Sequence, residues 1–308
     1  MRGYALLAAV SLMPLVCGCG GGSEPPAEPP QPQGPRIGVN LSGLDAGWRE
    51  VLTADLERLQ SQGLPGGAKL VVQEATENDA VQAKQVSELL SLELKGMIVA
   101  PRDAQSLTPP VAAAMAAKTP VVVLRRPVIG NQCSMMLDTN DEEIGRLAAQ
   151  WITAQFEGTV TIVELKGSSY PLTSAPCHEG FKNTLVDPRF RILLEAETEG
   201  KPEEARKQMH EALKRSKEIQ VVFTHSPEVA AAAHEEAVRA GLADSICFVT
   251  TGTMSDFAPP PSLPSYTGAV IYFSSGAKAA MQAITAGLEG KEPPRHQSLR
   301  LELVSRGG

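Results

Sequence analysis

The sequence has few aromatic residues and no run of basic residues. Aromatic side chains make up 4% of the 308 residues. With no long stretch of lysine or arginine, the chain lacks the phosphate neutralisation on which nucleic-acid binding depends. Its 28 basic and 35 acidic residues give a net charge of −7, which also argues against a nucleic-acid partner. Hydrophobic residues at 43% and charged residues at 20% exclude disorder, collagen and a disulfide-rich miniprotein for the whole chain. We expect a globular protein long enough for two lobes.

Cysteine and histidine patterns of catalytic or metal-binding type are also missing. Beyond the amino terminus, Cys133, Cys177 and Cys247 are widely spaced, with no CxxC motif and no zinc-type spacing. They allow at most one disulfide, and buried free thiols are the favoured interpretation. Cys177 adjoins His178, but neighbouring helical positions point about 100° apart, so the pair does not form a nucleophile with its base. We predict no enzymatic activity, no cofactor and no metal.

The amino terminus predicts export and a lipid anchor. Arg2 precedes an apolar run, Tyr4 to Val16, that is shorter than the roughly 20 residues of a membrane span but fits a secretory signal. Val16-Cys17-Gly18-Cys19 resembles a bacterial lipobox, and Cys19 is the favoured lipid acceptor because the small Gly18 precedes it. An ordinary signal peptide with two incidental cysteines is the alternative.

A polar tether follows the signal. GGGSEPPAEPPQPQGP (residues 20–35) contains no large apolar side chain that could bury enough surface to order it, and its prolines stiffen it. We assign residues 1–18 to a lipoprotein signal peptide and residues 19–35 to a Gly/Pro-rich tether. No other segment of the sequence reaches transmembrane length.

From residue 36 onward, short β-rich runs alternate with helical patterns. Apolar residues at positions 48, 51, 52, 56 and 59 mark one face of the first helix. The β-rich runs are continuously apolar, which is typical of strands buried on both faces of a parallel sheet. They form two series, at 37–42, 69–75, 96–101 and 120–125, and then at 159–165, 190–197, 219–225, 246–251, 267–273 and 299–304. The alternation predicts an α/β fold of two doubly wound parallel-sheet lobes, whose strands end at a shared cleft.

Several segments along the body carry a family resemblance. They are, in order, RIGVNLSGLDAGW, KGMIVAPRDAQSL, TPVVVLRR, LDTNDEEIGRLAAQWI, CHEGF and VVFTHSPEVAAAAHEEAVRAG. Together they resemble the type I periplasmic sugar-binding proteins, the ribose-binding type of ABC importers. LacI-type regulators share this body but begin with a helix-turn-helix. The signal and tether occupy that place here, which argues against a repressor.

The resemblance implies two lobes joined by a three-segment hinge. The N-terminal lobe would comprise 36–139 plus 272–297 and the C-terminal lobe 140–271 plus 298–305. The crossings are expected near Asp138–Asp141, Ala269–Phe273 and Glu292–Ser298.

It also implies a monomeric lipoprotein that captures a sugar or sugar-like solute for an ABC permease. The protein would be exported and lipid-anchored on the periplasmic or outer-surface side. A receptor of the same fold that signals to a membrane sensor is the alternative.

The resemblance places the ligand-binding residues of the first lobe at two strand ends. Trp48 corresponds to an aromatic that stacks on the sugar, and Arg49 replaces a second aromatic. Arg126 matches the arginine of an Asp-Arg pair, whereas Arg125 stands in place of the aspartate. Two alternatives stay open: Trp48 belongs to the core, because it also lies on the apolar stripe of its helix, or Arg125 forms a salt bridge at the hinge with Asp138 or Asp141.

In the second lobe, the expected sugar-reading side chains are replaced. Cys177 occupies the position of an arginine, Ser226 that of an asparagine and Thr251 that of an aspartate. Tyr272 lies near the position of a glutamine, and Tyr170 is a candidate aromatic lid. Because two carboxylates are missing and three arginines are present, an anionic solute is an alternative to the favoured sugar.

Overall fold

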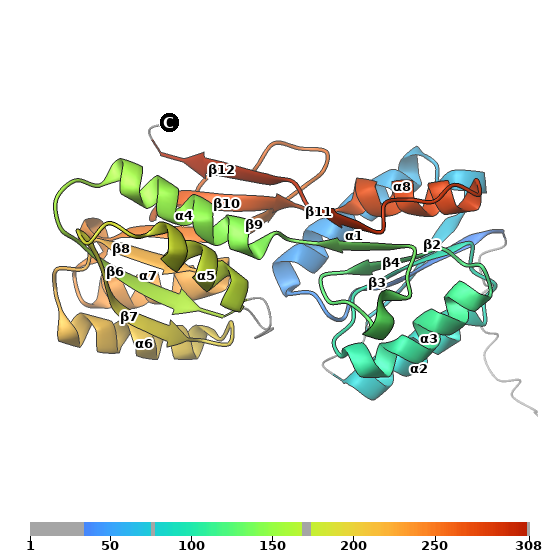
Figure 1. Ribbon diagram of the computed structural model, residues 1–308, viewed down its shortest axis with the longest axis horizontal. Coiled ribbons are helices and arrows are strands. Elements are labelled where there is room, and N and C mark those ends of the chain that lie inside the picture. Colours follow the sequence, from blue (N-terminus) through green and yellow to red (C-terminus); the bar gives the residue numbers. More distant parts are fainter. Residues whose placement is uncertain (1–33, 75–77, 168–173, 307–308) are drawn as a thin grey trace, which may run out of the picture. The chain divides into compact units, whose positions relative to one another are not determined.

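The computed structural model describes residues 34–74, 78–167 and 174–306. The body from Gly34 onward forms one compact unit (Figure 1). The expected signal peptide, the lipid-acceptor Cys19, most of the tether and the candidate lid Tyr170 lie outside the described residues. No helix within the described ranges combines the length and the apolar character needed to cross a membrane.

The first lobe is built on a fully parallel sheet with the strand order β11-β5-β4-β3-β1-β2. Its strands are β1 (Arg36–Asn40), β2 (Lys69–Gln73), β3 (Gly96–Val99), β4 (Val121–Leu124), β5 (Met135–Asp138) and β11 (His296–Ser298). The helices pack on both faces, as the continuously apolar strands require. One face carries α1 (Ala46–Gln62) and α8 (Ala277–Leu288), and the other carries α2 (Asp79–Leu90) and α3 (Ala104–Ala116).

The second lobe repeats this plan with the strand order β12-β10-β9-β8-β6-β7. Only the β10–β12 pair of this sheet is antiparallel. Its strands are β6 (Val160–Lys166), β7 (Phe190–Glu197), β8 (Val221–Thr224), β9 (Cys247–Met254), β10 (Thr267–Ser274) and β12 (Leu301–Ser305). One face carries α4 (Asp141–Gln155) and α5 (Ser174–Thr184), and the other carries α6 (Pro202–Arg215) and α7 (Pro227–Arg239).

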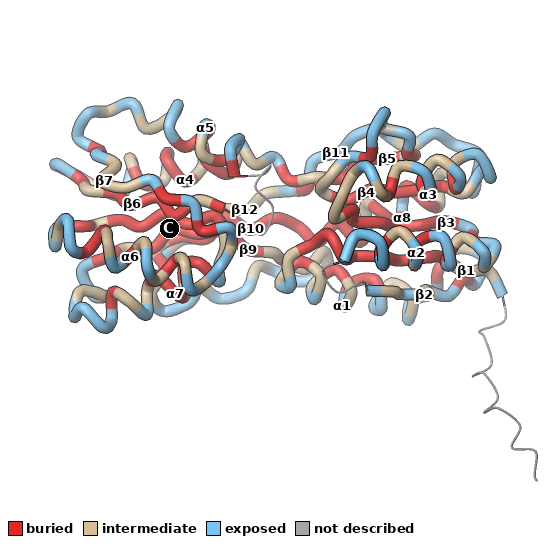
Figure 2. The backbone as a smooth tube through the Cα atoms, turned by 90° about the horizontal axis from the view of Figure 1, so that it is seen from below, coloured by how far each residue is buried: buried red, intermediate tan, exposed pale blue. Residues whose placement is uncertain are grey.

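Short 3₁₀ turns connect some of these elements, at η1 (Pro65–Gly67), η2 (Ile129–Asn131) and η4 (Ala243–Ser245). Figure 2 shows that buried residues follow the central strands of both sheets, whereas exposed residues gather on the outer sides of the helices. The predicted α/β fold of two parallel-sheet lobes is therefore confirmed.

The chain passes between the two sheets three times: from β5 to α4, from β10 to α8 and from β11 to β12. The crossing segments lie side by side. The amide of Leu299 donates to the carbonyl of Asp138 at 2.8 Å, and the amide of Ser274 donates to the carbonyl of Arg300 at 2.9 Å. These bonds join the three segments into the expected hinge.

Two crossings lie later in the chain than expected. β10 stays paired with β9 up to Ser274, so residues 272–274 belong to the second sheet and not to the first. Ser298 pairs with Asp138 in the first sheet, so the last crossing follows it. The physical reason is the same at both crossings: main-chain pairing within a sheet continues past the residue at which the sequence pattern suggested a crossing.

Candidate functional site

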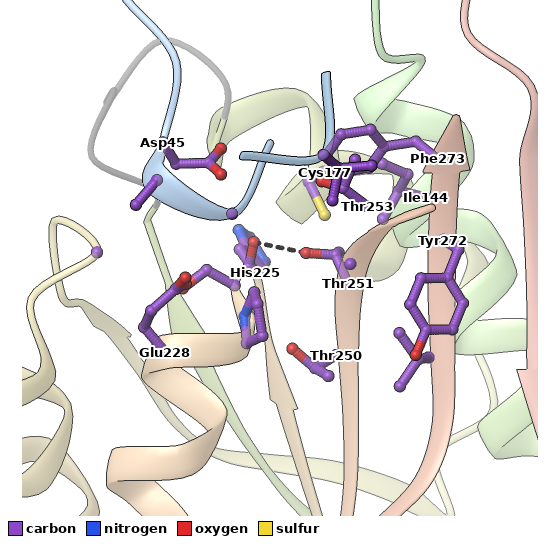
Figure 3. Close-up of a pocket in the computed structure, with 18 of the residues that line it drawn as sticks. Asp45, Ile144, Cys177, His225, Glu228, Thr250, Thr251, Thr253, Tyr272 and Phe273 are labelled. Atoms are coloured by element: carbon purple, nitrogen blue, oxygen red, sulfur yellow. Dashed lines mark hydrogen bonds between the residues drawn. The ribbon is translucent and has the colours of Figure 1, made fainter. Parts of the chain in front are cut away.

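A pocket of about 480 Å³ lies between the two lobes, at the ends of the second-lobe strands (Figure 3). The first lobe contributes the start of α1 and Arg125, which directly follows β4. The second lobe contributes the starts of α4, α5 and α7, together with the last parts of β9 and β10. Its size falls within the range of small-molecule sites, and carboxyl ends of parallel strands are where such folds bind ligands.

Five of the residues predicted for ligand binding line this pocket: Arg125, Cys177, Ser226, Thr251 and Tyr272. They come from both lobes and from elements far apart in the sequence. Their assignment as ligand contacts remains a prediction.

The hydroxyl groups among them already have partners within the protein. Thr251 Oγ1 donates to the main-chain carbonyl of His225 at 2.9 Å, the bond drawn in Figure 3. Ser226 caps α7 by accepting from the amide of Val229 at 3.3 Å. Tyr272 donates to the carbonyl of Pro261 at 3.3 Å. Each hydroxyl oxygen can still accept a hydrogen bond from a ligand. However, either its proton is already donated within the protein, or the oxygen is held in place by a bond that it accepts.

Cys177 is buried and chemically quiet. Burial raises the pKa of its thiol well above the ordinary value, and the nearby carboxylates of Asp141 and Glu164 raise it further. The thiol therefore stays protonated at neutral pH and offers neither a nucleophile nor the positive charge of the arginine it replaces.

Arg125 has an unusual backbone conformation at the junction of the lobes. Its φ of 63° lies in the left-handed region, where side chains other than glycine are uncommon. The conformation lets the amide of Arg126 bond to the carbonyl of Leu124 at 2.7 Å, which makes a tight turn directly after β4. Strain of this kind concentrates at functional sites.

Of the two hinge carboxylates, Asp141 is the one whose pKa is lowered by the charge of Arg125. Burial raises the pKa of Asp141, and the positive charge of Arg125 partly offsets that rise. Asp138 instead lies 2.9 Å from His296 Nε2 and 3.4 Å from the hydroxyl of Ser298. A salt bridge between Arg125 and a hinge carboxylate stays a prediction.

Trp48 does not line the pocket, and this corrects its expected stacking role. Its side chain is fully buried, its Nε1 donates to the carbonyl of Ser275 at 2.9 Å, and its ring meets that of Phe273 edge-on with centroids 4.9 Å apart. The core alternative describes it. Arg49, one residue on, turns away from the pocket toward Glu74, at 3.7 Å.

The three arginines predicted for ligand binding, Arg49, Arg125 and Arg126, do not all line one hollow. Arg126 lines a second hollow of about 460 Å³ beside the hinge, which Arg125 shares and where Asp138, Asp141 and Glu142 also lie. Arg49 therefore lies apart from the other two arginines, and carboxylates accompany Arg125 and Arg126.

Sequence reasoning missed the acidic lining of the main pocket. Asp45, Glu50, Asp141 and Glu228 line it, with Arg125 as the one arginine or lysine in the described lining. Three of these lie at helix starts: Asp45 caps α1, and Asp141 and Glu228 fall in the first turns of α4 and α7. Acidic residues at helix starts directly after a strand were the signal that could have revealed them, because those starts face the cleft in this fold.

No group of three or more histidine, cysteine, aspartate or glutamate side chains in the described ranges is arranged to hold a metal ion. The chemistry that the pocket offers is hydrogen bonding, mostly by acceptors, over an apolar floor.

Comparison with known proteins assigns the chain to a family. The profile described as "Periplasmic binding protein domain" matches residues 37–259, so the chain belongs to this family. Its members are exported solute-binding proteins rather than enzymes.

Among curated proteins, the ribose import binding protein RbsB of Bacillus subtilis (strain 168) is 22% identical over 199 residues, which cover 65% of this chain and 64% of the relative. The galactofuranose-binding protein YtfQ of Escherichia coli (strain K12) is 22% identical over 214 residues, covering 67% and 66%. The chain thus spans slightly less than two thirds of the length of RbsB.

Solved structures share the fold over most of the chain. The fructose-binding periplasmic domain of a hybrid two-component system superposes with a TM-score of 0.74 at 23% identity, over 89% of this chain and 91% of that domain. A periplasmic solute-binding protein of an ABC transporter from Actinobacillus succinogenes 130z, with bound D-allose, gives a TM-score of 0.75 at 16% identity, over 89% and 98%. These likenesses confirm the type I periplasmic binding protein fold.

Proposed function

We propose that this protein is a solute-binding lipoprotein that captures a sugar or sugar-like solute in the pocket between its lobes and delivers it to an ABC importer. The observation that carries the proposal is a pocket of about 480 Å³ lined by polar groups of both lobes at the carboxyl ends of their strands. Relatives named for ribose import and galactofuranose binding support the choice of ligand class. The protein acts as a monomer whose partner is a membrane permease.

The charge of the lining favours a neutral solute over an anionic one. Asp45, Glu50, Asp141 and Glu228 would repel a carboxylate or phosphate, and Arg125 alone would attract it. Carboxylates and an arginine together suit the hydroxyl groups of a sugar, which both donate and accept. Phe273 and Tyr272 contribute apolar surface for its C–H groups.

A panel of solutes tests the ligand class. Isothermal calorimetry on the purified full-length chain should detect binding of at least one of D-ribose, D-fructose, L-arabinose, D-allose and myo-inositol. D-galacturonate serves as the anionic comparison and should bind more weakly. Binding of D-galacturonate alone would support the anionic alternative, and binding of none of these solutes would contradict the proposal.

Arg125 provides a second test that separates ligand binding from hinge stability. If Arg125 holds the solute, Arg125→Ala should weaken binding by about 2–5 kcal/mol. Arg206→Ala, which removes a half-buried arginine that pairs with Glu235 and does not line the pocket, is the matched control. A lowered melting temperature with unchanged affinity would restrict Arg125 to the hinge.

The anchor at Cys19 lies outside the described residues and is tested separately. Mass spectrometry of the membrane fraction should find a mature chain that begins at an acylated Cys19. A mature form that starts elsewhere and carries no lipid would refute the anchor without affecting the binding function.

A further inference from the structure

A buried carboxylate beside the pocket floor is held between two imidazoles. Glu164, on β6, is fully buried. Its Oε1 lies 3.1 Å from His225 Nε2, and its Oε2 lies 2.7 Å from His178 Nδ1. His225 directly follows β8, whereas His178 lies on α5, so two neighbouring elements converge on one strand residue. A carboxyl group at this depth requires hydrogen-bond partners of this kind.

The contact with Glu164 assigns a tautomer to His225. Because the carboxylate oxygen is the acceptor in this contact, Nε2 of His225 is assigned as the donor. In the neutral ring, the other nitrogen, Nδ1, then presents a lone pair as an acceptor. Glu195 extends the chain of contacts outward, with its carboxylate 3.5 Å from His178 Nε2.

Nδ1 of His225 is buried and has no hydrogen-bond partner within residues 34–74, 78–167 and 174–306, although the residue lines the pocket. Only 4% of the side chain is exposed. The hydroxyls on either side of His225 are already engaged: Thr251 donates to the carbonyl of His225, and Thr224 donates to that of Ser226 at 3.1 Å. A buried acceptor without a donor destabilises a protein, so such a group calls for an explanation in the folded state.

We propose that His225 reads a hydroxyl group of the bound solute through Nδ1, and that Glu164 and His178 are positioning residues that fix its ring. The inference rests on the proposed function and deepens it, because it places a hydrogen-bond acceptor on the second-lobe wall. The recognised solute must offer a donor there. A hydroxyl of a neutral sugar does so, whereas the carboxylate of a sugar acid does not.

Two matched substitutions test the roles of the two ring nitrogens separately. The amide nitrogen of His225→Gln stands where Nε2 stood, so this variant keeps a donor for Glu164 but loses the acceptor at the Nδ1 position. The side chain of His225→Asn reaches only as far as Nδ1, so it keeps the acceptor and loses the bond to Glu164. The control is His210→Gln, in an exposed pair with Glu236 at 2.8 Å.

Calorimetry with D-ribose, D-fructose, L-arabinose and D-allose on the full-length chain gives the readout. For the sugar that binds the wild type, His225→Gln should weaken binding about tenfold with little change in melting temperature. His225→Asn should bind within about threefold of the wild type but melt at a lower temperature. His210→Gln should change neither quantity.

Nitrogen-15 spectra of the histidine rings in the wild type supply a measurement that does not depend on variant folding. Nδ1 of His225 should be unprotonated in the free protein and should shift when the sugar is added, while the His210 signals stay in place. A protonated Nδ1, or an unmoved signal in the sugar complex, would overturn the assignment.

The remaining outcomes also decide the question. Wild-type affinity in His225→Gln, or a loss of affinity in His225→Asn alone, overturns the reading role and leaves a structural one, with the proposed function intact. Failure of these four sugars and of myo-inositol to bind the wild-type chain overturns the proposed sugar class, and this assignment with it.

Discussion

Removing the carboxylate of Asp55 should destabilise the junction between the lobes more than any comparable surface change. Asp55 lies in the middle of α1 with 4% of its surface exposed. It accepts hydrogen bonds from the hydroxyls of Ser255 and Ser275 at 2.6 Å each, and from the amide of Asp256 at 2.7 Å. Ser255 and Asp256 follow β9 of the second lobe, and Ser275 lies in the second crossing. One side chain of the first lobe therefore binds the second lobe and the hinge together.

The magnitude follows from these three bonds. A hydrogen bond to a charged group contributes about 1.5–3 kcal/mol, but the two serine hydroxyls can rotate toward other acceptors when Asp55 is gone. We therefore expect Asp55→Ala to lower the free energy of unfolding by about 3–5 kcal/mol. Most of this loss comes from the main-chain amide of Asp256, which is left without an acceptor, and from the lost charge-assisted bonds. At about 2 °C for each kcal/mol in a protein of this size, the melting temperature should fall by about 6–10 °C.

Differential scanning calorimetry measures this change, with two comparison variants. Asp244→Ala removes an exposed aspartate of η4 and should leave the melting temperature unchanged. Asp55→Asn keeps the shape and one acceptor oxygen and should give roughly half of the loss seen for alanine. A melting temperature of Asp55→Ala within about 2 °C of the wild type would show that desolvation of the carboxylate cancels its bonds, and would refute the reasoning.

Three further expectations concern groups around the hinge and pocket. Burial raises the pKa of Cys133, Cys177 and Cys247, so iodoacetamide should leave all three unmodified in the native protein at neutral pH and label them after denaturation; rapid native labelling would contradict their burial. Burial also raises the pKa of Asp141, so the stability it contributes is complete below its unfolded pKa of 3.8 and is lost as the pH rises through its higher folded pKa. Asp141→Asn should therefore gain stability relative to the wild type as the pH rises above about 4, measured by melting temperature, and a constant difference would contradict this. Gly145→Ala would place a Cβ 1.9 Å from the carbonyl oxygen of Cys177. It should therefore lower the free energy of unfolding by about 3 kcal/mol by forcing α4 and α5 apart, and an unchanged urea midpoint would show that the two helices separate without cost.

The sheets were predictable because their strands are buried on both faces. The run at 120–125 contains only apolar residues up to Leu124, and the structure buries every residue of β4 there. β5 and β11 were not predicted as strands. β11 has three exposed residues and lacks any apolar pattern, so its place in the sheet follows from pairing with β5 and not from its own sequence.

Much of the candidate site depends on contacts that no local pattern reveals. Trp48 lies on the apolar stripe of α1 and packs in the core, although a position carried over from relatives suggested stacking on a ligand. The resemblance transfers positions but not the direction in which a side chain points. Asp55 and Ser275 are 220 residues apart, and Glu164 meets His225 across 61. Only the folded arrangement brings such pairs together.

The order of the strands has a consequence for when each sheet gains its last edge strand during folding. β11 and β12 are adjacent in sequence, yet each forms the edge of a different sheet. Until residues 296–305 are available to pair, β5 and β10 each present a row of unpaired main-chain groups, the kind of edge on which other strands add. Neither lobe can therefore mature ahead of the other in the usual amino-to-carboxyl order. The same ten residues close both edges, so the nascent protein stays open to mispairing until its last strands arrive.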